Sequence, residues 1–203
     1  MRLGPKAMEA LRAEITGRLI LGDELVVIGP VGLSGTVRIV KEKYDHLRDF
    51  FSEGFLEDAL MLLQNFGIGE DPKTSKAWQM AEGYGADALY AMGEGGVLSA
   101  VWKMAEASLL GLKADLRKIP IRQETIEITE KYEIDPYRLV SEGSLLVGIR
   151  GGQALVQACL HSGLMAAVIG QTDKGNDRLL YSGENVRYLN RPEKDEIYKI
   201  FKA

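Results

Sequence analysis

The order of apolar and polar residues predicts a chain in which helices and short buried strands alternate. Uninterrupted apolar runs, such as those within Glu24–Ile28 and Ser144–Ile149, are typical of strands covered on both faces. Longer segments with apolar residues three and four positions apart, clearest from Val97 to Ser108, are typical of helices buried along one side. The pattern therefore predicts an α+β fold in which helices pack on a mixed sheet.

Glycine and proline residues separate these segments and set their expected limits. Helices are predicted over residues 5–16, 36–51, 55–66, 74–84, 97–108, 123–132 and 152–161. Further strands are predicted over residues 87–91, 112–116 and 166–170, and a hairpin is predicted to join 177–181 to 186–189 through the turn 182–185.

The first predicted helix stands apart from the rest. We interpret residues 1–21 as a helical appendage and residues 22–203 as one domain. Met8, Leu11 and Ile15 share one face of the predicted helix, so an apolar face is available for packing.

Composition excludes several classes of function. The 203 residues are 46% hydrophobic and 27% charged, which is ordinary for a globular domain. The net charge is -4 and the basic residues are scattered, so nucleic acid is not an expected partner. No apolar run approaches the length of a membrane span, so no membrane partner is expected either. The single cysteine, Cys159, fits a reducing compartment, and we expect a cytoplasmic protein.

Two glycine-rich loops, Gly29–Gly35 and Gly93–Gly96, share one design: each follows a strand and opens a helix. Glycines let backbone N–H groups turn inward, and a helix N-terminus adds partial positive charge, so such loops can hold a phosphate or another anion. Alternatively, the glycines only permit tight strand-to-helix turns, since neither loop matches the P-loop or dinucleotide-binding pattern. The candidate anion-binding residues are Gly32, Ser34, Gly35, Thr36, Gly93, Gly95 and Gly96.

Two glutamates are further candidates for a cleft. Glu94 lies in the second loop, where a carboxylate can bind a metal or act as a base, or can interact with the helix dipole. Glu142 precedes a predicted strand, where it can face a cleft or cap the turn. His46 and His161 have no His or Cys at ligand spacing, so no metal site and no catalytic residue is assigned.

The segment Gly93–Ser108 (GEGGVLSAVWKMAEAS) resembles a superfamily of ATP-dependent enzymes. It contains aminoimidazole ribonucleotide (AIR) synthase, formylglycinamidine ribonucleotide synthetase, selenophosphate synthetase, thiamine-monophosphate kinase and a hydrogenase maturation factor that dehydrates a carbamoyl group. The resemblance covers roughly residues 22 to 200 and is closest to the hydrogenase-maturation-like, AIR synthase-related branch. It extends through Lys118–Ile121, Ile134–Tyr137, Ser141–Leu146, Gly170–Asp173 and Gly175–Arg178.

The resemblance implies the fold of the family's C-terminal domain. Family members also carry an N-terminal domain that binds ATP with magnesium and builds much of a dimer, and here about twenty residues occupy that place. The family's helix-opening loop reads His-Asp-x-Thr-x-Gly-Gly, whereas residues 90–96 read Tyr-Ala-Met-Gly-Glu-Gly-Gly. The C-terminal cysteine tail of the hydrogenase factor is also absent. We therefore expect no cofactor, with ATP and magnesium only if a partner chain supplies the missing domain.

Three functional hypotheses follow from this resemblance. The first is a non-catalytic domain that acts as a homodimer or with another chain, its leading helix covering part of the surface that a lost domain would expose. The second is half of a split ATP-dependent enzyme, completed by a separate ATP-binding chain. The third is a small-molecule sensor that keeps an anion pocket without turnover.

Overall fold

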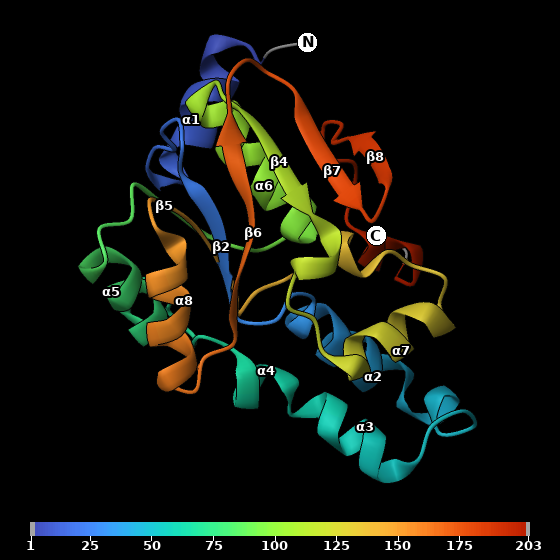
Figure 1. Ribbon diagram of the computed structural model, residues 1–203. Helices are drawn as coiled ribbons and strands as arrows, with labels where there is room; N and C mark the ends of the chain where they lie inside the picture. The colour runs from blue at the N-terminus through green and yellow to red at the C-terminus, as the bar shows by residue number, and fades with distance from the viewer. Residues whose placement is uncertain (1–2, 202–203) are drawn as a thin grey trace.

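The computed structural model describes residues 3–201, in which helices surround a mixed eight-stranded sheet (Figure 1). The sheet order is β1-β3-β5-β2-β6-β4-β7-β8, and every neighbouring pair is antiparallel except the parallel pair β4 and β7. The strands are β1 (Thr16–Gly17), β2 (Glu24–Ile28), β3 (Ala88–Ala91), β4 (Gly111–Asp115), β5 (Leu145–Ile149), β6 (Ala166–Asp173), β7 (Arg178–Ser182) and β8 (Asn185–Tyr188). The predicted α+β fold with a mixed sheet is confirmed.

Helices cover the sheet on both faces and at one end. On one face lie α1 (Pro5–Ala13) and α6 (Gly96–Ser108), and on the other lie α5 (Lys76–Gly83) and α8 (Gly152–His161). Figure 1 shows the remaining helices below the sheet, where they form a separate cluster. These are α2 (Leu33–Leu47), α3 (Glu53–Leu60), α4 (Leu62–Phe66) and α7 (Gln123–Lys131). The chain also forms four short 3-10 turns within the described residues: η1 (Pro72–Thr74), η2 (Leu116–Lys118), η3 (Pro136–Arg138) and η4 (Glu196–Lys199).

The centre of the sheet explains the unbroken apolar runs in the sequence. β2 pairs with β5 on one side and β6 on the other, and Leu25, Val26, Val27 and Ile28 are each 0% exposed. Successive side chains point to opposite faces of a strand, so a strand covered on both faces must be apolar at every position.

Several predicted segments differ from the observed ones. The predicted helix 5–16 ends at Ala13 and is followed by β1. The predicted helix 55–66 is two helices, α3 and α4, which meet at Met61 (φ -90, ψ -3). The predicted helix 36–51 begins earlier, at Leu33, because Gly32 in the left-handed region opens it. The predicted strand 166–170 continues to Asp173, because pairing with β4 extends through Leu112↔Thr172 and Gly111↔Asp173.

The appended helix α1 packs on α6 through the face that the sequence predicts. Leu11 and Ile15 are buried at 6% and 8% exposure in the same cluster as Trp102. The Arg12 Nε donates to the Ala107 carbonyl at 3.1 Å, which fixes α1 against the last turn of α6.

We predict that Leu11→Ala loosens this contact and lowers the free energy of unfolding by about 2–5 kcal/mol, the usual range for a buried leucine. Glu9→Ala on the exposed side of α1 is the matched control and should leave stability nearly unchanged. Urea unfolding followed by circular dichroism measures both. Equal stability of Leu11→Ala and wild type would contradict the packing described for α1.

A buried carboxylate lies in the turn that leads into β2. Asp23 is 0% exposed; its Oδ2 accepts the Ile20 N–H at 2.8 Å, whereas its Oδ1 has no hydrogen-bond partner in the described residues. Burial raises the pKa of Asp23 from 3.8 to about 6, and the nearby Asp87 carboxylate adds to the increase. The folded protein therefore keeps a proton on Asp23 at a pH where the unfolded chain releases it.

This raised pKa predicts a pH-dependent stability. The stabilising effect of the Asp23 proton is complete below about pH 4 and is lost as the pH rises through about 6. In Asp23→Asn, which stays neutral, the free energy of unfolding should rise relative to wild type by about 1–3 kcal/mol from pH 4 to pH 7. Urea titrations at both pH values test this, with the exposed Asp58→Asn as control; stability curves for Asp23→Asn that run parallel to wild type would exclude it.

Candidate functional site

The two glycine-rich loops lie on either side of one short segment, residues 139–142. The Gly35 N–H donates to the Val140 carbonyl at 3.2 Å, and the Ser141 N–H donates to the Gly93 carbonyl at 3.1 Å. A Cβ at Gly35 would lie 2.4 Å from the Leu139 Cγ, so a side chain there would force the buried Leu139 to move. The tertiary structure therefore brings together loops that are about sixty residues apart in the sequence.

In the first loop, polar groups of the chain itself occupy the candidate donors. The Gly32 N–H donates to the buried Ser141 Oγ at 2.8 Å. The Thr36 hydroxyl bonds to the Gly32 carbonyl at 2.8 Å and to the Thr125 hydroxyl at 3.0 Å. The Ser34 hydroxyl bonds to the Val140 carbonyl and accepts the Glu142 N–H at 3.0 Å.

In the second loop, a carboxylate from the far end of the chain binds the N-terminus of α6. Gly95 precedes the helix with φ +78, and its N–H donates to Asp195 Oδ2 at 2.6 Å. The other Asp195 oxygen accepts the Ile197 N–H at 2.9 Å. Asp195 is 4% exposed, and burial raises its pKa even though three backbone N–H groups oppose the increase. An internal anion therefore lies where the sequence analysis places an external one.

Sequence reasoning missed Asp195 because it stands one hundred residues from Gly95, in a polar terminal segment without a motif. The structure shows that this segment is not a loose end, since Ile197 is 2% exposed and packs with α2 and α7. After Pro192, four charged residues precede Ile197, Ile200 and Phe201, so apolar residues occur in this segment, but their pattern does not show what they contact.

The two candidate glutamates, Glu94 and Glu142, are solvent-exposed. Glu94 accepts a hydrogen bond from the Tyr198 hydroxyl of the terminal segment. Tyr90 lies at the position where the sequence analysis expects the family histidine. The Lys103 ammonium donates a hydrogen bond to its phenol oxygen at 2.8 Å. Lys103 also pairs with Glu14 at 2.9 Å, so this position now anchors the residues after α1.

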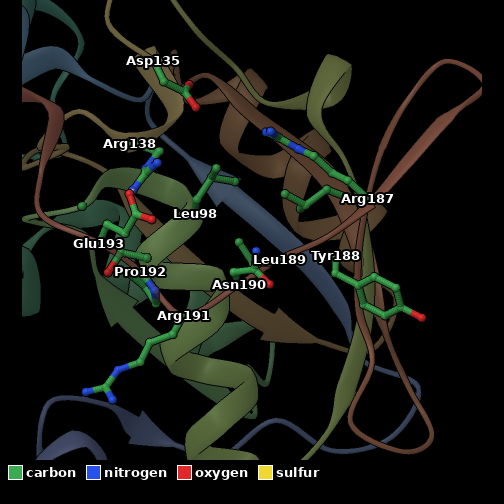
Figure 2. A pocket seen from close by; sticks show the side chains of 13 residues that line it. Leu98, Asp135, Arg138, Arg187, Tyr188, Leu189, Asn190, Arg191, Pro192 and Glu193 are labelled. Atoms are coloured by element: carbon green, nitrogen blue, oxygen red, sulfur yellow. The ribbon is translucent and has the colours of Figure 1, made fainter. Parts of the chain in front are cut away.

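A pocket of about 150 Å³ opens beside the first turn of α6 (Figure 2). Its walls are Gly95, the α6 residues Leu98 and Ser99, the η3 turn, the end of β8 and the chain that follows it. Apolar side chains of Leu98, Leu180 and Leu189 line part of it, and the lining also contains three arginines, Arg138, Arg187 and Arg191. None of these arginines was a candidate in the sequence analysis.

The described residues contain no group of three or more His, Cys, Asp or Glu side chains able to hold a metal ion. Over the same part of the chain, no helix combines the length and the apolarity that crossing a bilayer requires. Cys159 is a free cysteine, buried at 0% exposure.

Comparison with solved structures confirms the fold. E. coli HypE, a hydrogenase maturation protein, is 23% identical, matches 90% of this chain and 53% of its own, and has a TM-score of 0.68. Thiamine-monophosphate kinase from Stenotrophomonas maltophilia K279a is 19% identical over 81% of this chain and 51% of its own, with a TM-score of 0.61. A HypE chain from a HypE–HypF complex is 19% identical over 86% of this chain and 54% of its own, with a TM-score of 0.58.

The chain thus spans about half the length of these structural neighbours. No curated protein sequence matches it. The profile of the family described as AIR synthase related protein, C-terminal domain, matches residues 21–181, which is most of the chain. The chain therefore belongs to the AIR synthase-related family, and residues 21–181 are its C-terminal-type domain.

Proposed function

We propose that this chain is a non-catalytic AIR synthase-related domain that acts through assembly, first of all with a second copy of itself. The observation that carries the proposal is the Asp195 carboxylate on the Gly95 N–H, at 2.6 Å. An enzyme that binds a phosphate at this helix N-terminus needs its N–H groups free for the ligand. Here Ser141 and Asp195 take up the donors of Gly32 and Gly95.

The side chains of the second loop support the same proposal. Catalysis of phosphoryl transfer depends on groups that position the phosphate and neutralise its charge. At the loop positions where the family has histidine and aspartate, this chain has Tyr90 and Ala91. The Tyr90 hydroxyl bonds to Lys103 and Glu14, so it supports packing rather than a ligand.

The assembly surface that the fold offers is the edge strand β8. It is the last strand in the sheet order of the described residues, and all four of its residues are exposed. Val186 and Tyr188 are exposed at 52% and 64%. An unpaired edge with apolar side chains is a template for another strand, and two copies related by a two-fold axis pair antiparallel.

We predict that wild type forms a dimer and that Val186→Lys shifts it to monomer, because lysine on an edge strand opposes edge-to-edge pairing. Leu160→Lys is the matched control, since Leu160 is similarly exposed, at 49%, but lies on α8. Size-exclusion chromatography with light scattering over a range of concentrations measures the mass. A wild type that stays monomeric at every concentration would contradict self-assembly.

A second candidate function is half of a split ATP-dependent enzyme, completed by a separate ATP-binding chain. The observation that favours it is the match of this chain to only about half of each structural neighbour, 53% of E. coli HypE and 51% of the kinase. One neighbour was solved as a complex of HypE with HypF, so a chain of this fold can assemble with a different protein.

Titration with ATP and magnesium separates the two candidates. Under our proposal, this chain alone does not bind ATP-Mg. A ligand raises the melting temperature only if it binds the folded protein, so we expect no binding heat and no change in melting temperature. Binding by the chain alone would contradict the non-catalytic proposal. Binding that requires an added ATP-binding chain from a neighbouring gene would favour the split enzyme.

A further inference from the structure

We propose that the pocket beside the first turn of α6 is a binding site for a small oxyanion, namely inorganic phosphate or the phosphate group of a small monoester. This site is distinct from the glycine-loop donors, which the chain itself occupies, and it goes beyond the assembly role. We call it the arginine pocket and define it by Ser99, Arg138, Arg187, Asn190 and Glu193.

Two guanidinium groups reach the arginine pocket from different elements. Arg138 belongs to η3, and Arg187 belongs to β8. Figure 2 shows Arg187 extending from the hairpin toward Arg138 and Asp135, whereas Arg191 extends away from the other labelled side chains. Within residues 3–201, the Arg187 guanidinium makes no hydrogen bond or ion pair, so its donors are available to a ligand. Arginine presents a planar fork of donors that suits phosphate oxygens.

The helix contributes a hydroxyl that has no other use in the described structure. Ser99 is 5% exposed and lines the pocket, and its hydroxyl has no hydrogen-bond partner among the residues described. Because the Ser99 oxygen is not fully buried, it can bond to a ligand or to water in the pocket. Ser99 lies in the first turn of the thirteen-residue helix α6.

Two carboxylates share the pocket with the two guanidinium groups. Arg138 and Arg187 lie beside Asp135 and Glu193, whereas Arg191 points away. Asp135 is held by the turn it caps, since its Oδ1 accepts the Tyr137 N–H at 2.9 Å. Glu193 instead pairs with Arg138 at 2.9 Å from a side chain that is 82% exposed. Because exposed ion pairs contribute little, Glu193 is a weak internal competitor that an oxyanion can displace into solvent.

Half of this pocket lies outside the segment that matches the family. The family profile ends at residue 181, whereas Arg187, Asn190 and Glu193 follow it. Ser99 and Arg138 lie within the matched segment. The pocket thus forms where the terminal hairpin of this chain folds over the family scaffold, and its specificity depends on residues that the family pattern does not include.

The test is a titration of the intact chain with inorganic phosphate at constant ionic strength, followed by NMR amide shifts and by calorimetry. We expect the Ser99 amide to shift and Arg187→Gln to weaken phosphate binding about tenfold or more, because a charge-assisted hydrogen bond is lost. Arg191→Gln is the matched control, one arginine of the same pocket wall that points away, and should change affinity by less than about twofold. Glu193→Gln should strengthen binding severalfold, because it removes the carboxylate at 2.9 Å from Arg138 and leaves, among the described residues, only Glu196, at 4.0 Å.

Two results would overturn the proposal. One is equal weakening by Arg187→Gln and Arg191→Gln, which would show a diffuse effect of net charge. The other is the absence of phosphate binding in Glu193→Gln, in which the competing carboxylate is gone. Both arginines are exposed, so neither variant depends on a change in folding, and circular dichroism of each variant checks this. The dimer measurement is independent of phosphate, so the two proposals can fail separately.

Discussion

Two helices, α2 and α6, begin inside the molecule, and the backbone N–H groups at their starts must find acceptors there. A helix leaves its first N–H groups without intrahelical partners, and a buried donor without an acceptor is costly. Ser141 meets this demand for Gly32, and Asp195 meets it for Gly95. These buried N–H groups need acceptors. This need explains why residues 139–142 pass between the two loops and why the terminal segment returns onto α6.

The same contacts explain why the glycines are needed whether or not a ligand binds. A Cβ at Gly96 would lie 2.6 Å from the carbonyl oxygens of Tyr137 and Leu139, closer than real Cβ atoms approach. At Gly35 the nearest atoms belong to the Leu139 side chain, which would have to move. Close packing alone can therefore require the glycines of a loop whose sequence suggests an anion-binding site. This observation supports our proposal of a non-catalytic domain in which the loop side chains contribute to packing.

The chain beyond residue 181 gives this scaffold its individual features. It adds the hairpin strand β8, which is a free edge of the sheet, and the acidic segment that follows. Within that segment Asp195 is buried and fixed by backbone donors, whereas Glu193 is exposed and held by one ion pair. The two carboxylates thus differ in how easily a competing anion replaces them, and the difference comes from burial.

The sequence by itself determined the elements and the fold class. Periodicity located the buried strands β2 and β5, the helix α6 and the terminal hairpin, because side-chain spacing follows local backbone geometry. It also identified the glycine loops. Only the tertiary structure decided what the loops contact. Asp195 bonds to Gly95, and Arg138 and Arg187 line one pocket, although the members of each pair lie far apart along the chain. No local pattern records which distant groups a fold brings together.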